Sequence, residues 1–224
     1  ESIEDIKKKT QQGLFYIDEA KKEEVEPEVI FYFSGHGVGY QNNNYLFPVD
    51  VSTINSKEEL MANAISLNRV VRQLADATNG TKIIIIDACR NKLITSNINT
   101  SEDLFYDRKN TTILDMKSFE DNIISIQARP TFQPMKADKN MLLAYATAPG
   151  EFAYYKKDLQ YSFFTKALID SIEENPEKSL KEILTISRQS VLNETEGRQT
   201  TWDSSSLMNS YFFPYSFTNY IKDE

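Results

Sequence analysis

Residues 82–91, Lys-Ile-Ile-Ile-Ile-Asp-Ala-Cys-Arg-Asn, carry the strongest structural signal in the chain. Four consecutive isoleucines put β-branched side chains on both faces of a strand. Such a run is typical of a strand that is buried on both sides in a parallel sheet. It ends at Asp87, and Cys89 follows two residues later. The stretch therefore predicts a buried parallel strand that brings polar residues to the rim of an α/β sheet, where active sites of such sheets gather.

A second stretch, residues 28–37, repeats this pattern. Its β-branched and aromatic residues predict a buried strand that stops at Gly35-His36-Gly37. If the two strands are near neighbours in one sheet, their carboxyl ends bring His36 and Cys89 to the same rim. An imidazole beside a thiol takes its proton or stabilises the thiolate, which makes the sulfur a nucleophile. The backbone N–H groups of Gly37 and Cys89 are predicted to form an oxyanion hole.

The single cysteine and the single histidine also have less specific interpretations. A lone cysteine at a strand end is more often a small buried hydrophobic residue, and a lone histidine beside glycines is more often part of a turn. Because the only Cys and the only His of the chain both fall at predicted rim positions, the catalytic interpretation is favoured. The same counts exclude an internal disulfide and a zinc site built from Cys and His.

The rest of the chain alternates between helical and extended patterns. Such alternation predicts an α/β fold with a mostly parallel sheet that is covered on both faces. Residues 92–139 lack periodicity and are predicted to be a long linker. The predicted helices cover residues 2–25, 67–78, 162–172 and 179–193, and the remaining strands cover residues 45–48, 141–146 and 210–213.

The charge and hydropathy of the chain limit its partners. The formal net charge is -8 and the longest run of Lys or Arg is short, so nucleic acid and anionic membrane are not expected to bind. The apolar runs are too short to span a bilayer. The first residues have neither the basic start nor the apolar stretch of a signal peptide, so a cytoplasmic location is expected.

Several motifs, taken in order, resemble those of one peptidase family. Residues 31–37, Phe-Tyr-Phe-Ser-Gly-His-Gly, resemble the histidine motif of caspase-like peptidases, especially the metacaspases and bacterial members. Residues 87–91, Asp-Ala-Cys-Arg-Asn, resemble the nucleophile motif, and the spacing of about 50 residues from His to Cys agrees with that of caspases. Residues 143–150, 162–165 and 199–207 resemble motifs of the small-subunit region. The resemblance covers about residues 2–214.

This resemblance implies a three-layer α/β/α sandwich and a cysteine endopeptidase. It divides one caspase domain into a large-subunit-like part, residues 1–91, a linker, residues 92–139, and a small-subunit-like part, residues 140–224. The family fold begins with a central strand, a helix and another strand ahead of the helix predicted at residues 2–25. Those elements are missing from these 224 residues, so we expect the chain to be the catalytic piece of a longer protein.

The resemblance also implies a preference for basic substrates. Animal caspases hold an aspartate at P1 with a Gln two residues before the Cys, whereas metacaspases and paracaspases place an Asp there that pairs with Arg or Lys. Asp87 occupies that position here, and a carboxylate in the S1 pocket would attract a cation and repel an acid. The alternative is that Asp87 only caps the end of its strand. The other predicted substrate-binding residues are Asp50, Ala153, Tyr154 and Tyr155, of which Tyr155 replaces the caspase specificity Arg.

The linker and the partners follow from the same interpretation. If P1 is basic, the bond between Arg108 and Lys109 is the preferred self-cleavage site. The expected partners are protein substrates and a regulatory sensor domain or activator. No organic cofactor and no metal are required, and calcium dependence stays open. Two alternatives remain: an inert caspase-like scaffold, and an interaction module that another protease releases.

Overall fold

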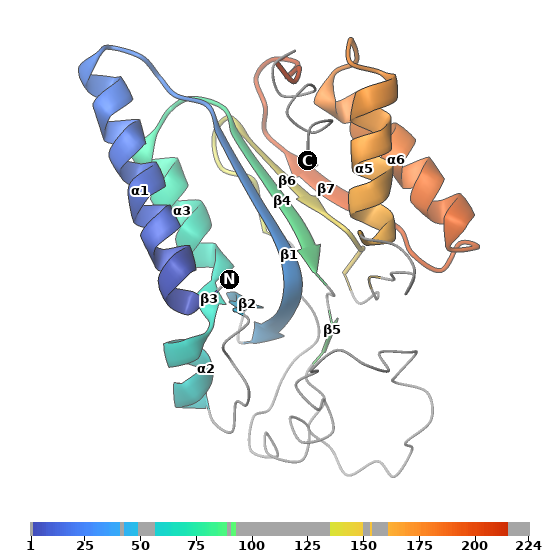
Figure 1. Cartoon of the computed structure of the whole chain (residues 1–224), viewed down its shortest axis with the longest axis horizontal. Helices are drawn as coiled ribbons and strands as arrows, with labels where there is room; N and C mark the ends of the chain where they lie inside the picture. Colours follow the sequence, from blue (N-terminus) through green and yellow to red (C-terminus); the bar gives the residue numbers. More distant parts are fainter. Residues whose placement is uncertain are drawn as a thin grey trace.

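The computed structural model describes residues 2–40, 43–48, 57–88, 91–92, 135–149, 153 and 161–214. The protein is a three-layer α/β/α sandwich, with α1 and α3 on one face of the sheet and α5 and α6 on the other (Figure 1). The helices are α1 (Ile3–Lys22), α2 (Lys57–Asn63), α3 (Leu67–Ala77), α5 (Phe163–Glu174) and α6 (Leu180–Glu194). The strands are β1 (Val29–Tyr40), β2 (Asn43–Phe47), β3 (Ile65–Ser66), β4 (Lys82–Ala88), β5 (Asn91–Lys92), β6 (Met141–Tyr145) and β7 (Trp202–Ser205).

The sheet has a parallel centre and antiparallel margins. Its order is β3-β2-β1-β4-β6-β7, and β5 pairs with the end of β1. Strands β1, β4 and β6 are parallel, whereas β2, β3 and β7 join by antiparallel pairing. The predicted α/β sandwich is therefore confirmed, and its parallel part is the part that carries the predicted rim residues.

The four isoleucines of β4 show why a continuous apolar run is needed at the centre of the sheet. Ile84 and Ile86 belong to the core beneath α1 and α3, whereas Ile83 and Ile85 belong to the core beneath α5 and α6. Successive side chains of a strand point to opposite faces, and both faces are covered here. All four are at most 4% exposed, as expected for a strand with a helical layer on each side.

Lys82, at the start of β4, is a buried charged residue. Its side chain is only 2% exposed, and its Nζ donates to the carbonyl oxygens of Thr78 at 2.9 Å and Gly80 at 2.8 Å. Burial lowers the pKa of its ammonium group. The two carbonyls lie in the turn between α3 and β4, so Lys82 ties this turn to the start of the central strand.

The helix starts agree with the sequence patterns. Ser2 and Asp5 form a capping box at the start of α1, and Ser179 and Glu182 form a second one before α6. Helix α1 ends at Lys22, three residues earlier than predicted. Pro27 thus lies in the connection to β1, beyond the helix end.

Two predicted elements near the chain's key motifs were wrong in detail. Strand β1 does not stop at residue 35 but runs on to Tyr40, because it changes partner there: Gly35 pairs with β4, and His36 is the first residue to pair with β2. Residues 210–213 are not a strand. Tyr211 and Phe213 are buried in the core beside α5 and α6, and Tyr211 accepts a backbone hydrogen bond from Leu180. Tyr211 and Phe213 are two residues apart because their aromatic rings pack into the core, and no strand hydrogen bonds form in this described stretch.

One margin of β1 is open in the described part of the chain. From Val29 to Gly35 its sheet partner is β4, on one side only. On one face of this stretch, Ile30 and Tyr32 are 37% and 47% exposed. The expectation that the family's first strands precede these residues in a longer protein stays a prediction.

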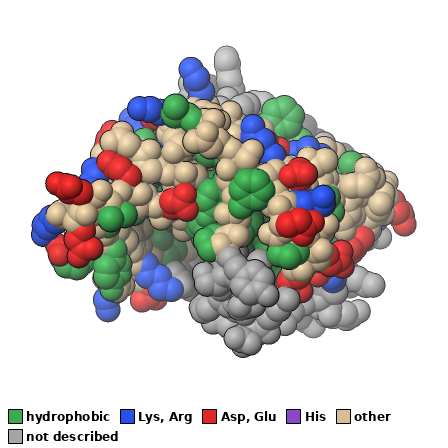
Figure 2. All heavy atoms as spheres, turned by 90° about the horizontal axis from the view of Figure 1, so that it is seen from above, with side chains coloured by type: hydrophobic (Ala, Val, Ile, Leu, Met, Phe, Trp, Pro, Cys, Tyr) green, Lys and Arg blue, Asp and Glu red, His purple; other side chains and the backbone are tan. Residues whose placement is uncertain are grey.

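The surface shows no concentration of one charge on the face that Figure 2 presents. Lys and Arg side chains lie among Asp and Glu side chains there, with hydrophobic groups between them. Within the part of the chain that the structure describes, no helix combines the length and apolar character needed to cross a membrane.

Gly80 and Gly13 offer a matched test of the packing. A Cβ at Gly80 would lie 2.2 Å from the carbonyl oxygen of Pro27, whereas a Cβ at Gly13 in α1 would meet no atom within 4 Å. We expect Gly80→Ala to lower the free energy of unfolding by about 1–3 kcal/mol, because backbone must shift to admit the methyl group. Gly13→Ala should raise it by about 0.5–1 kcal/mol through helix propensity. Urea denaturation measures both, and an unchanged midpoint for Gly80→Ala would contradict this packing.

Candidate active site

The register between β1 and β4 brings the two predicted catalytic motifs to one rim. The strands are parallel, with Ser34 opposite Asp87 and Gly35 opposite Ala88. The next residue along β1 is His36, and the next residue after β4 is Cys89. Cys89 itself lies outside the described residues. The paired residues Gly35 and Ala88 therefore directly precede His36 and Cys89, the two members of the predicted dyad.

His36 and Gly37 lie in the part of β1 that pairs with β2. His36 is opposite Phe47 and Gly37 is opposite Leu46, and both are half-buried. The strand curves in this region (Figure 1). Leu46 is fully buried, which anchors β2 and with it the extended stretch that carries His36.

Asp87, the last polar residue of β4, is held by hydroxyl groups. Its side chain is 4% exposed. Its Oδ2 accepts hydrogen bonds from Ser162 Oγ at 2.5 Å and Thr165 Oγ1 at 2.6 Å, and a longer one from Ser34 Oγ at 3.5 Å. Three elements, β1, β4 and the start of α5, therefore meet at this carboxyl group.

The N-terminus of α5 lies next to Asp87 and favours a negative charge there. Ser162 is the N-cap of this helix, and its Oγ accepts from the backbone N–H of Thr165 at 3.0 Å. The positive end of the helix dipole thus faces the Asp87 carboxyl group. Tyr32 joins the cluster through a 2.7 Å hydrogen bond to Thr165 Oγ1. The pKa of the Tyr32 hydroxyl is raised, first by burial of this group and further by the charge of Asp87.

The remaining predicted site residues divide into one described residue and a larger undescribed set. Ala153 is partly buried and packs against the core beneath α5 and α6. This places it on the same side of the sheet as Ser162 and Thr165. The predicted residues that lie outside the described part of the chain are Cys89, Asp50, Tyr154, Tyr155, Arg108 and Lys109.

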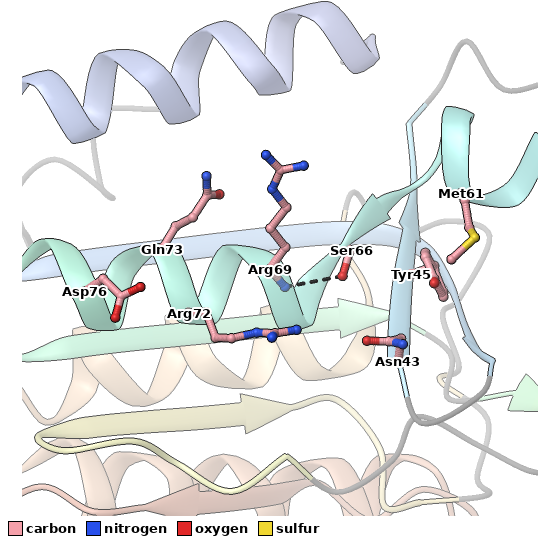
Figure 3. Close-up of a pocket in the computed structure, with 8 residues that line it drawn as sticks. All are labelled: Asn43, Tyr45, Met61, Ser66, Arg69, Arg72, Gln73 and Asp76. Carbon is pink, nitrogen blue, oxygen red and sulfur yellow. Dashed lines mark hydrogen bonds between the residues drawn. The ribbon is translucent and has the colours of Figure 1, made fainter.

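A hollow elsewhere on the surface does not coincide with this cluster. It has a volume of about 510 Å³ and opens between β2, α2 and α3 (Figure 3). Arg72 points toward Asn43 there, and Ser66 caps α3 through the N–H of Arg69. None of the predicted site residues that the structure describes lines it, and it mixes basic groups with Asp76. It is therefore a separate feature from the rim that carries Asp87.

Comparison with known proteins identifies the class to which this fold and rim belong. The family model for the caspase domain matches residues 9–213, which is most of the chain. The chain therefore belongs to the caspase-domain family of cysteine peptidases, and its α/β sandwich is the fold of that family. A comparison with curated proteins found no match.

The hydroxyl partners of Asp87 are the feature of the candidate site that the sequence did not reveal. Residues 162–165, Ser-Phe-Phe-Thr, were recognisable as the start of a helix, since Ser is a favoured N-cap. What no local pattern shows is that both hydroxyls of this stretch reach Asp87, a residue in a distant part of the sequence. The only signal was the presence of two hydroxyl residues in one helix start.

Proposed function

We propose that this protein is a cysteine endopeptidase that cleaves proteins after Arg or Lys, with Cys89 as nucleophile and His36 as general base and acid. Membership of the caspase-domain family supports the peptidase class. The observation that carries the specific proposal is the register of β1 and β4, in which Gly35 pairs with Ala88. It aligns the residue before His36 with the residue before Cys89.

The proposed reaction has two halves. His36 takes the proton of Cys89, whose sulfur attacks the scissile carbonyl carbon. The backbone N–H groups of Gly37 and Cys89 stabilise the oxyanion. The C–N bond then breaks, and the proton passes from His36 to the leaving amine. A water molecule, deprotonated by His36, attacks the thioester, and its products are the carboxyl end of the substrate and the free thiol.

The preference for a basic P1 residue rests on Asp87. The described partners of its Oδ2 are neutral hydroxyl groups, which orient a carboxylate without cancelling its charge. A guanidinium or ammonium group next to it would gain a charge-assisted bond, whereas an acidic P1 side chain would be repelled. In this proposal Asp50, Ala153, Tyr154 and Tyr155 complete the substrate groove.

Activation and regulation are part of the same proposal. Cleavage between Arg108 and Lys109 separates a large-subunit-like part, residues 1–91 with the start of the linker, from a small-subunit-like part, residues 140–224. A regulatory partner or sensor domain keeps the peptidase inactive until it is needed. The chemistry requires no organic cofactor, because the thiol, the imidazole and water supply every reacting group.

Paired fluorogenic peptides test this function. We expect peptides with Arg or Lys at P1 to be cleaved at least about 100-fold more efficiently than the same peptide with Asp at P1, since opposite and like charges at a buried site differ by several kcal/mol. Calcium is included and omitted in parallel. Mass measurement of the chain after each incubation locates any cut in the linker.

The possible outcomes test the P1 preference, the self-cleavage and the peptidase activity separately. Cleavage after Asp alone would keep the peptidase and overturn the role of Asp87. An intact linker in a fully active preparation would remove self-cleavage from the proposal. The inert scaffold would be favoured if no peptide is cleaved in any condition and Cys89 also fails to react with a thiol reagent and with a peptide ketone.

A further inference from the structure

The donors and acceptors of the cluster around Asp87 can be assigned from its geometry. Ser162 Oγ accepts from the Thr165 N–H, so its own proton is available for Asp87. Thr165 Oγ1 has one proton, and its bond of 2.6 Å to a carboxylate uses it. Tyr32 must therefore be the donor in its bond to Thr165. The Ser162 and Thr165 hydroxyls thus both donate to Asp87, and Tyr32 supports them by donating to Thr165; donors of this kind stabilise the ionised carboxyl group.

The cluster also joins three elements of the fold. Tyr32 lies on β1, Asp87 on β4, and Ser162 with Thr165 on α5. Helix α5 packs on α6, through buried bonds such as that between Ser187 and Ser171, and on β4 and β6 through the apolar core. The hydroxyl bonds thus connect the α5–α6 pair to the rim at which β1 and β4 end.

We propose that Ser162 and Thr165 are specificity-determining residues, which position the Asp87 carboxylate for a cationic P1 side chain. This inference rests on the proposed function, because it concerns how the same pocket selects its substrate. The two hydroxyls fix the direction of the carboxylate and leave its charge in place for the substrate. We call the four residues Asp87, Ser162, Thr165 and Tyr32 the hydroxyl clamp.

A purely structural role would give a different result from a positioning role. If the clamp served only to attach α5, its loss would lower stability and affect all substrates equally. If it positions Asp87, its loss lowers efficiency for a charged P1 side chain and spares a neutral one of the same shape. The ratio of kcat/KM for a P1 arginine peptide to that for the matching P1 citrulline peptide distinguishes the two roles, because citrulline keeps the shape of arginine without its charge.

Five variants provide the test and its controls. Ser162→Ala and Thr165→Val remove one clamp hydroxyl each, and Ser162→Thr keeps a hydroxyl as a rescue. Ser179→Ala is the control for a lost helix cap, because Ser179 caps α6 and bonds to Glu182 instead of Asp87. Thr185→Val is the control for the threonine change, since Thr185 is exposed and donates to the Lys181 carbonyl.

We expect Ser162→Ala and Thr165→Val each to lower the arginine-to-citrulline ratio about tenfold, mostly through KM for the arginine peptide. Ser162→Thr and the two controls should leave the ratio unchanged. If the two clamp variants lower kcat/KM for both peptides by the same factor, the clamp is structural and the inference is wrong. If Ser162→Ala does not fold, Thr165→Val, which retains the cap, answers the same question.

Binding of agmatine, a small guanidinium compound, tests the clamp without catalysis. Titration followed by NMR should show weaker binding, about tenfold, in the two clamp variants than in the controls. Such a loss in a chain that cleaves no peptide would uphold the clamp and overturn the proposed function. Equal agmatine binding in the wild type and both clamp variants would overturn the clamp, even if the protein cleaves after arginine.

Discussion

Replacement of Cys89 by alanine is expected to abolish peptide cleavage, with a fall in kcat of about 10⁴–10⁶-fold. The proposed thioester cannot form without the sulfur, and the residual rate then comes from substrate binding and the oxyanion hole alone. His36→Ala should cost nearly as much, because a neutral thiol attacks a peptide bond poorly. The double variant should be no worse than either single one, since the two side chains act as a unit. The linker should stay intact in all three.

The composition of the chain allows the reactivity of the predicted nucleophile to be measured directly. There is one cysteine, so iodoacetamide alkylation reports on Cys89 alone. The wild-type thiol should be alkylated faster at neutral pH than the thiol of His36→Ala, because the imidazole stabilises the thiolate. Retention of full activity by Cys89→Ala would rule out the thiol mechanism.

The apolar elements were predictable because their patterns have strong local causes. The isoleucine run of β4 must be buried on both faces. Helix α6 follows Ser179, whose backbone N–H and Oγ both donate to the carboxylate of Glu182. Strand β7, in contrast, consists of Trp202, Asp203 and two serines, which carry no strand pattern. It forms because it pairs with β6, and Arg188 on α6 holds it by bonding to Asp203 and to the Thr201 carbonyl.

At the candidate site, too, contacts between residues far apart in the sequence could not be predicted from local patterns. Asp87 was recognisable from its place before Cys89, because a polar residue at the end of a buried strand stands out. Its hydroxyl partners were not, since their contact depends on how α5 packs against β4. The extension of β1 past Gly35 has a similar cause: glycines usually end a strand, yet pairing with β2 extends this one. In each case a long-range contact overrides the local pattern.

Replacement of Asp87 by asparagine is expected to lower the preference for arginine over citrulline at P1 by about 30- to 1,000-fold. Asparagine keeps the shape of the side chain, and its amide oxygen can still accept from Ser162 and Thr165, so the fold should be retained. Asp87→Ala is a poorer test, because it would leave these buried hydroxyls without their acceptor and cost about 1–3 kcal/mol of stability. The measurement is the ratio of kcat/KM for the two peptides, with urea denaturation as the check on folding.

The matched control for this experiment is Asp50→Asn, which changes the other acid predicted to line the S1 pocket. If Asp87 provides the decisive charge, Asp50→Asn should change the ratio by less than about tenfold. A retained preference for arginine in Asp87→Asn, together with its loss in Asp50→Asn, would move the specificity to Asp50. Asp87 would then act only as the acceptor that fastens α5 to the end of β4. That result would also remove the basis of the hydroxyl clamp as a specificity device, because the clamp acts on the substrate only through the charge it holds.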